Sequence, residues 1–409
     1  MQVSMVIDLG FGDAGKGRTV DWLCARRPES SLVIRYGGGH QVGHTVSIGG
    51  LVHVFSNFGA GSLRGVPTWF GRDCTVFPPA IAAEQAALTA LLPPGSPSPE
   101  LAIHPLAKVC TPWDIAWNRA AEAELGHGSC GVGFGATVER HAAGVPLYAK
   151  DLAFDWVARQ KLQGIRYWYG QRAAAWSASG DDFAGCFAAE CDSLDLDAYL
   201  AQCRAAAACY RLAGLEECLA GKDHLVFEGH QGLMLDQHHG IYPHVTWSST
   251  GSAPALALLA GLADSGGGAN QAGSAWRVCP VDLYCVTRCY QTRHGRGPMS
   301  SSQPVALVAA DAETNRDNGF QGAFRSAELD PELLAYALVS DRAERADLPV
   351  KFAVRENLVV TCLDQRPGFR LAELVRRLDW PPDRVYYSPS ADSAALRAFC
   401  GNNLDLETL

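Results

Sequence analysis

Residues 7–19 read IDLGFGDAGKGRT, a glycine-rich turn between an apolar, β-branched run and a segment with the composition of a helix. A strand, a glycine turn and a helix in this order direct backbone N–H groups and a helix N-terminus to one point, where a phosphate can bind. The spacing of Gly10, Gly15 and Lys16 is that of a phosphate-binding loop, but Gly17 stands where such loops carry a metal-binding hydroxyl. A glycine turn can also be purely structural; the complete spacing with a lysine favours phosphate binding.

Asp13 is the unusual residue of this turn. A carboxylate inside a phosphate-binding loop repels the ligand unless a cation neutralises the carboxylate or it has a proton to move. Asp13 is therefore a candidate metal ligand or general base, and as a metal ligand it would replace the hydroxyl that Gly17 lacks.

Composition limits the class of protein. The chain has 409 residues, of which 48% are hydrophobic and 19% charged, so a soluble globular protein is expected. The net charge of -9 argues against a broad nucleic-acid surface but leaves room for a small anionic ligand. Fourteen scattered cysteines without a Cys-x-x-Cys pair, and a start without a signal-like segment, predict a reducing, cytoplasmic setting, and no apolar run is long enough to cross a bilayer.

Short β-branched runs recur along the chain and are followed by helix-like stretches, which predicts an α/β fold with a mainly parallel central sheet. We expect one large domain over residues 1–409 with helical and loop insertions, and with ligands at the carboxyl ends of the strands. The expected strands are 3–10, 31–37, 224–229, 282–290 and 356–364. The expected helices are 17–24, 116–125, 199–220 and 371–378, and the expected loops are 91–100 and 264–276.

A second glycine-rich segment, RYGGGHQVGHT at residues 35–45, carries His40 and His44 four residues apart. On a helix this spacing would suggest a metal site, but the glycines favour a loop that lets the backbone approach a ligand. A histidine in such a loop can donate a proton to an oxygen that gains negative charge, although a lone buried histidine is more often structural.

The two segments together resemble the opening of adenylosuccinate synthetases, which read Trp-Gly-Asp-Glu-Gly-Lys-Gly-Lys and then Gly-Gly-His-Asn-Ala-Gly-His-Thr. Residues 226–250, VFEGHQGLMLDQHHGIYPHVTWSST, are similar to the Phe-Glu-Gly-Ala-Gln-Gly to Tyr-Pro-x-Val-Thr-Ser-Ser segment of that family. Residues 290–298, YQTRHGRGP, are similar to its Tyr-x-Thr-Arg-Val-Gly-x-Gly-Pro segment. The chain is thus identified from four ordered motifs as a divergent member of this family.

The resemblance implies a ligation in two steps: GTP phosphorylates the 6-oxo group of inosine monophosphate, and an amine, aspartate in the family, displaces the phosphate. It implies catalytic roles for Asp13 as the base, His44 as the acid, Lys16 at the transferring phosphate and Gln231 beside Asp13. Asp13 and the carbonyl of Gly43 would hold Mg²⁺. Such a transfer depends on positioning, a cation and several donors more than on covalent help from the protein.

The resemblance also implies two sets of binding residues. GTP, with ATP as an alternative donor, would be bound by Gly12, Gly15, Lys16, Gly17, Thr45, Asp364 and Ser388. Here Asp364 matches the acid that reads guanine, and Ser388 lies in a short segment, residues 386–393, that echoes a guanine-closing loop. The acceptor would be bound by Gln41, Ser129, Cys130, Gln231, Leu235, Thr246, His294 and Arg325.

Several positions depart from the family pattern. Ser129 and Cys130 replace threonines, and Val132 replaces an arginine. Arg140 is the nearest candidate for an arginine that reaches the nucleotide phosphate of the partner subunit, and Arg325 is alone where the family has several arginines for aspartate. Forked guanidinium contacts to carboxylates contribute roughly 1.5 to 3 kcal/mol each, so affinity for aspartate should fall by orders of magnitude.

Two hypotheses remain open. The first is a C–N ligase acting on an inosine monophosphate-like purine, or a divergent form acting on a modified nucleoside or another carbonyl or amide substrate. The second is a nucleotide-binding homologue without turnover. In both, the partners are small nucleotides, a homodimer is implied by the resemblance, and neither nucleic acid nor a membrane is expected.

Overall fold

A computed structural model shows the fold and describes all residues except 127, 178–182, 265–275, 277, 310–318 and 400–409. Its centre is a ten-stranded sheet in the order β16-β15-β14-β11-β1-β10-β2-β5-β7-β9. Every neighbouring pair is parallel except β15 with β16. The α/β class and the mainly parallel sheet predicted from the sequence are confirmed.

The five predicted strands form the middle of this sheet. They are β1 (Gln2–Asp8), β2 (Ser31–Arg35), β10 (His224–Glu228), β11 (Val281–Arg288) and β14 (Val354–Thr361). The outer strands are β5 (Thr68–Phe70), β7 (Leu101–Ile103), β9 (Arg211–Leu212), β15 (Arg384–Tyr387) and β16 (Arg397–Ala398). Small pairs lie outside it: β3 (His44–Ile48) with β4 (Leu51–Phe55), β6 (Thr75–Val76) with β8 (Lys108–Val109), and β12 (Gln291–His294) with β13 (Phe324–Ala327).

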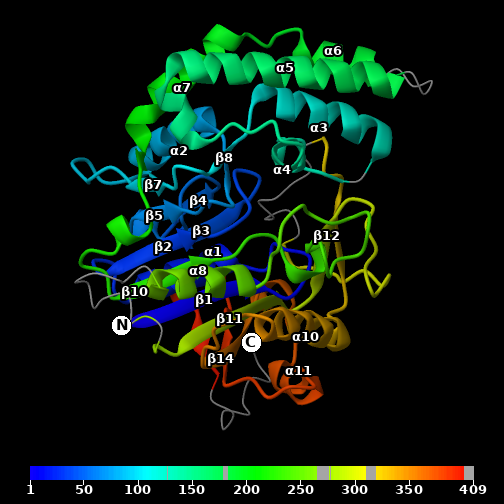
Figure 1. The fold of residues 1–409 in the computed structure, drawn as a ribbon. Helices are drawn as coiled ribbons and strands as arrows, with labels where there is room; N and C mark the ends of the chain where they lie inside the picture. Colours follow the sequence, from blue (N-terminus) through cyan, green and yellow to red (C-terminus); the bar gives the residue numbers. More distant parts are fainter. Residues whose placement is uncertain (127, 178–182, 265–275, 277, 310–318, 400–409) are drawn as a thin grey trace.

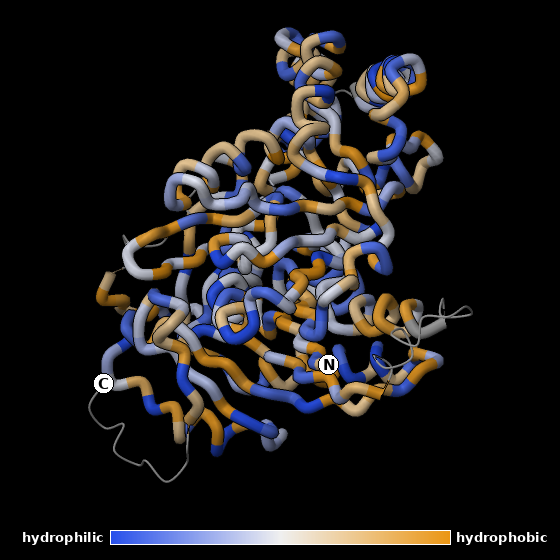
Figure 2. Tube along the Cα trace, turned by 90° about the vertical axis from the view of Figure 1, so that its left-hand side faces the viewer, coloured by the Kyte–Doolittle hydropathy of each residue, from blue (hydrophilic) through white to orange (hydrophobic). Residues whose placement is uncertain are grey.

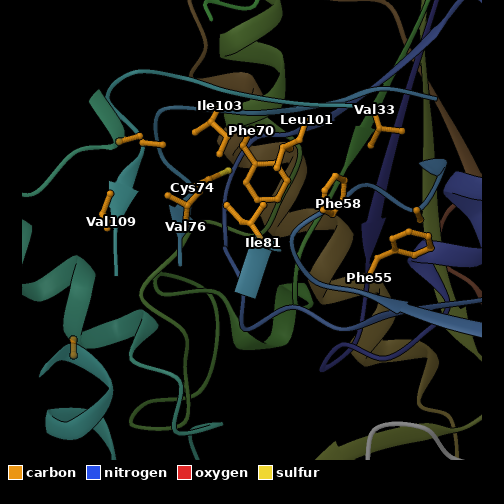
Figure 3. Packing of buried hydrophobic residues seen from close by; sticks show 14 of the residues in the cluster. Val33, Phe55, Phe58, Phe70, Cys74, Val76, Ile81, Leu101, Ile103 and Val109 are labelled. Atoms are coloured by element: carbon orange, nitrogen blue, oxygen red, sulfur yellow. The ribbon is translucent and has the colours of Figure 1, made fainter. Parts of the chain in front are cut away.

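The central strands are apolar on both faces because the sheet separates two cores. Along β1, Val6 packs into one core, whereas Met5 and Ile7 pack into the other. Apolar segments follow the strands through the interior (Figure 2). Toward the β9 end of the sheet, Phe70 of β5 and Leu101 of β7 point toward Ile81 of helix α2 (Pro78–Leu91) (Figure 3). Covered faces explain why these strands read as continuous apolar runs rather than alternating patterns.

Helices pack on both faces of the sheet. In Figure 1, α2 to α7 lie in the upper part of the molecule, and α10 and α11 lie in its lower part, near β11 and β14. Their bounds are α1 (Lys16–Cys24), α2 (Pro78–Leu91), α3 (Pro112–Leu125), α4 (Phe134–Ala142), α5 (Asp155–Ser177), α6 (Phe183–Cys191), α7 (Leu196–Ala206), α8 (Ala253–Asp264), α10 (Pro331–Ala346) and α11 (Leu371–Arg377). Within the described residues, none of the helices is both long and apolar enough to pass through a bilayer.

The helix predicted at residues 199–220 is only partly correct. Helix α7 starts earlier, at Leu196, and ends at Ala206, after which a 3₁₀ turn leads into β9. The alanine-rich composition favours a helix locally, but pairing of Arg211 with Ala102 in β7 makes this segment the edge of the sheet. The predicted loop at residues 91–100 is confirmed from Leu92 onward, and that at 264–276 falls almost entirely outside the described residues.

Three histidines are enclosed by the fold in their neutral form. His224 lies between the hydroxyls of Ser4 and Ser31, at 3.1 and 2.9 Å, and burial lowers its pKa to about 4. Burial likewise lowers the pKa of His40 to about 4 and that of His230 well below its ordinary value. At a pH where these histidines are protonated in the unfolded chain but not in the folded one, each of them therefore lowers the free energy of unfolding.

We predict that the free energy of unfolding falls as the pH is lowered from 7 to 5. The folded state keeps these imidazoles neutral while the unfolded state protonates them, which costs up to about 1.4 kcal/mol per pH unit for each histidine. Urea unfolding at pH 7.5, 6.5 and 5.5 measures the slope, which His224→Gln should reduce and the exposed control His238→Gln should not. Stability that stays constant or rises over this range would contradict the prediction.

Candidate active site

The phosphate-loop turn is held from inside by a residue at the end of β1. The carboxylate of Asp8 accepts hydrogen bonds from the backbone N–H groups of Gly10 and Ala14, at 2.9 and 3.1 Å, and from Lys16 Nζ at 2.9 Å. Gly12, Asp13 and Gly15 all have positive φ angles, of 92, 57 and 94°. The turn therefore closes around Asp8 and directs the start of α1 toward the space above it.

The missing hydroxyl at Gly17 has a packing explanation. A Cβ atom on Gly17 would lie 2.8 Å from Cβ of His44, which is closer than real side chains approach. The first turn of α1 therefore lies directly against the start of β3. Glycine at this position lets the phosphate loop and His44 meet at one point.

His44 is fixed by a buried carboxylate that the sequence reading did not single out. Its Nδ1 lies 2.6 Å from Oε1 of Glu228, at the end of β10, and the two side chains are 5% and 0% exposed. Nε2 of His44 has no hydrogen-bond partner among the described residues. Burial lowers the pKa of His44 despite the opposing charge of Glu228, so a negative group beside Nε2 would be needed to favour the imidazolium.

Asp13 lies among cationic groups. Nε of Arg288 donates to its backbone oxygen at 2.5 Å, and Nε2 of His294 lies 3.3 Å from its Oδ2. Burial alone would raise the pKa of the Asp13 carboxyl, but His294 together with the charges of Arg288 and Lys16 holds it at about 2. Asp13 is thus an ionised carboxylate in the resting protein, which suits a cation ligand.

One cavity of about 990 Å³ joins these groups. Most residues singled out from the sequence line it; several come from the turn after β1, the loop before β3, the start of β3, the loop after β10 and from β12. They are Gly12, Asp13, Gly15, Lys16, Gly17, Gln41, Gly43, His44, Thr45, Ser129, Cys130, Gln231, Leu235, Thr246, His294 and Asp364. The cavity therefore brings together residues that lie 352 positions apart in the chain, from Gly12 to Asp364.

The described residues offer two oxygen donors for a magnesium ion whose remaining ligands would be phosphate and water. Asp13 and Gly43 line the same cavity, and they offer a carboxylate and a backbone carbonyl, which are hard oxygen donors. No group of three or more His, Cys, Asp or Glu side chains arranged for a metal occurs in the described part of the chain. Mg²⁺ commonly binds through one or two protein oxygens plus phosphate and water, so this sparse set suits it.

Comparison with known proteins identifies the fold and the family. A model of the adenylosuccinate synthetase family matches residues 5–320. The chain belongs to this family. Adenylosuccinate synthetase of Neisseria gonorrhoeae (strain ATCC 700825 / FA 1090) is 30% identical over 328 residues, covering 77% of this chain and 68% of that protein. That of Burkholderia thailandensis is 30% identical over 333 residues, covering 76% and 64%.

Two solved structures share the fold. Fully ligated adenylosuccinate synthetase from Plasmodium falciparum matches with a TM-score of 0.68 and 14% identity over 98% of this chain and 100% of that one. Cyanophage S-2L succinoaminodeoxyadenylate synthetase, bound to dGMP and dATP as an energy donor, matches with a TM-score of 0.61 and 16% identity over 97% and 95%. As a member of the adenylosuccinate synthetase family, the protein is a ligase that forms C–N bonds.

Arg140 cannot serve as the arginine that reaches a partner's nucleotide, so that part of the sequence reading is wrong. Its side chain is 0% exposed and pairs with Asp114, at 2.8 Å from Nε and 3.0 Å from Nη2. Its Nη1 and Nη2 also donate to the carbonyls of Val145 and Val109. The guanidinium ties α4 to α3 and to β8, and it offers nothing to a neighbouring chain.

Two further residues lie outside the described lining of the cavity. Arg325, on β13, donates to the carbonyl of Gly297, and its strand partner is Arg293. Ser388 is fully buried, and its hydroxyl lies 3.0 Å from Nη1 of Arg18. That Arg325 and Ser388 contact ligands stays a prediction. Nε of Arg325 is buried without a hydrogen-bond partner in the described structure, and Ser388 contacts Arg18, which lines the cavity.

Other lining residues were not found from the sequence. Arg293 follows the recognised Tyr-x-Thr motif, and its guanidinium lies 4.3 Å from the ring centre of Phe11; burial and nearby Arg325 lower its pKa to about 10. Trp117, Trp176 and Trp247 also line the cavity. The motifs around Arg293 and Trp247 could have indicated their roles, whereas Trp117 and Trp176 reach the cavity through tertiary packing.

We predict that Gly17→Ser, which restores the usual phosphate-loop hydroxyl, lowers both the free energy of unfolding and the affinity for GTP. The new Cβ would push into His44, and overpacking of this kind costs about 1 to 3 kcal/mol. Urea unfolding and GTP titration should both show a loss, while Gly164→Ser, placed in open space on α5, leaves GTP affinity unchanged. Tighter GTP binding by Gly17→Ser would refute the packing explanation.

We predict that Arg140→Met affects folding and not nucleotide affinity. Removing the guanidinium leaves the Asp114 carboxylate buried without its cation, at a cost of about 3 to 5 kcal/mol. Chemical unfolding measures the loss, and GTP titration of the folded fraction measures affinity, with the exposed Arg376→Met as control. A variant with normal stability but weak nucleotide binding would show that Arg140 does reach a ligand.

Proposed function

We propose that this ligase transfers a phosphoryl group from GTP to the 6-oxo oxygen of a purine-like acceptor and then replaces the phosphate with an amine. The observation that carries the proposal is the meeting of Asp13, Lys16, His44 and Gln231 at one cavity, with His44 held by Glu228. Phosphorylation turns a poor leaving group into a good one, so the amine can then attack the same carbon.

Each residue has a role that follows from its position. The Asp13 carboxylate, ionised at neutral pH, accepts the proton of the purine N1–H, and the Gln231 amide at the same wall orients the ring. Lys16, held by Asp8, supplies a fixed charge to the transferring phosphate. Nε2 of His44 faces no protein partner among the described residues and, once an anionic phosphate favours the imidazolium, donates a hydrogen bond to it.

The donor and the metal follow from the same cavity. Asp364 lies on its lining near Gln365 and Cys362, where it would read the N–H groups of a guanine, which favours GTP over ATP. Asp13 and the carbonyl of Gly43 would hold Mg²⁺, which neutralises phosphate charge when bound. We further propose a homodimer in the cytoplasm, as the family resemblance implies.

A specific observation favours a second candidate, nucleotide binding without turnover. Arg325 donates one hydrogen bond to a backbone carbonyl and Arg140 is enclosed by the fold, which reduces the number of cations available to grip substrates. Against this stands the intact buried pair of His44 and Glu228, since a protein that only binds nucleotides needs no proton donor fixed in this way.

Asp13→Asn separates the two candidates. Because the amide cannot take a proton, we expect phosphate release from GTP in the presence of Mg²⁺, an oxopurine acceptor and an amine to fall by about 10²- to 10⁴-fold. The exposed carboxylate variant Asp73→Asn is the matched control. Wild-type protein that binds GTP but releases no phosphate with any acceptor and amine would establish the binding role instead.

A further inference from the structure

The cavity has two ends, and only one of them belongs to the phosphate donor. The donor end is formed by the phosphate loop together with Cys362 and Asp364. The opposite end is formed by α3, α4 and α5, and we call it the acceptor end. Because the proposed function places the reacting oxygen beside Asp13 and His44, the remainder of the acceptor must extend into this end.

The acceptor end is rich in aromatic side chains. Trp117 is 4% exposed and lies edge-on to Trp176, with 5.7 Å between the ring centres. Trp247 follows Thr246 directly and stands between the Val-Thr and Ser-Ser pairs that are adjacent in the matching family motif. Its side chain is 54% exposed and lies over Gly135 of α4, where a Cβ would come within 3.3 Å of the indole. Trp117 is therefore covered by its neighbours, whereas Trp247 offers a flat apolar surface to a ligand.

The charges at the acceptor end do not favour an anion. Arg172 is the only cation among the described cavity-lining residues of α3, α4 and α5. It pairs with Glu139 at 2.7 Å, and its guanidinium lies 4.7 Å from the ring centre of Trp117. Glu122 adds a second carboxylate to the same lining. These three side chains together carry one net negative charge, and the one cation among them is already paired, so they disfavour a phosphate beside them.

Neutral polar groups also line the cavity. Both amide atoms of Gln41 and Oε1 of Gln231 are buried without a hydrogen-bond partner in the described structure. Ser129 adds a hydroxyl that is already linked to Asn118 at 2.8 Å, and Thr246 adds another. Amides and hydroxyls match the hydroxyl and carbonyl groups of a nucleoside, and buried unpaired amides gain most from such a ligand.

We infer that the acceptor is uncharged at this end: an unphosphorylated 6-oxopurine nucleoside, with its sugar side against Trp247, in place of a nucleoside monophosphate. This inference rests on the proposed function for the position of the purine. The negative lining formed by Glu122 and Glu139 selects against the monophosphate, while Trp247 and the neutral amides select for the nucleoside.

Equilibrium dialysis of the full chain with labelled inosine and labelled inosine monophosphate, in the presence of Mg²⁺ and GDP, tests the inference without requiring the amine. We expect inosine to bind at least about tenfold more tightly, which corresponds to a difference of about 1.4 kcal/mol. Tighter binding of inosine monophosphate overturns the inference but leaves the proposed function intact. Binding of GDP without either acceptor overturns both, because the purine acceptor itself would then be wrong.

Charge variants test the cause of the selectivity. The double variant Glu122→Gln, Glu139→Gln removes the two negative charges, and we expect affinity for inosine monophosphate relative to inosine to rise about tenfold. Glu124→Gln, on the exposed side of α3, is the control. Trp247→Ala should weaken inosine binding and spare GDP, with the exposed Trp156→Ala as control. An unchanged ratio in the double variant, or unchanged inosine binding by Trp247→Ala, contradicts the inference.

Discussion

The carboxylate of Asp8 fixes the phosphate loop, and the positions of the other residues of the site depend on this loop. It ends the central strand of the sheet and holds two backbone N–H groups and the ammonium of Lys16. Since Asp8 and Lys16 are both almost fully buried, the pair is screened little by solvent and its geometry is rigid. The phosphate loop is thus shaped by an internal ion pair before any ligand arrives, which lowers the ordering that a nucleotide must impose.

A second constraint joins the loop to the chemistry. The start of α1 packs so closely on His44 that residue 17 can have no side chain, and Glu228 holds His44 from the adjacent strand β10. On the other side, Arg288 at the end of β11 holds the backbone of Asp13. Three neighbouring parallel strands therefore each end in a group that fixes one member of the site. Ligand positions at the carboxyl ends of such strands follow from this geometry.

The sequence predicted the parts of the site that local patterns encode and missed those that arise from packing. The phosphate loop, the glycine-rich segment around His44 and the central strands carry spacing or periodicity that identifies them directly. Glu228 reads as the last residue of an apolar strand, and Asp8 does too, so nothing local marks their roles. The role of Arg140 was predicted wrongly because its closeness to a motif in the sequence does not reveal that its guanidinium is buried. The helix predicted at 199–220 was too long because pairing in an edge strand overrode the local helix propensity.

The enclosed guanidinium of Arg140 also bears on how copies of this chain can cooperate. All of its described contacts lie within α3, α4 and their neighbouring strand and loop, so α4 has no cation to lend to another molecule. Arg140 therefore cannot be the group by which one subunit completes the site of another. An intact subunit paired with an inactivated one would, as far as Arg140 is concerned, keep its own full turnover.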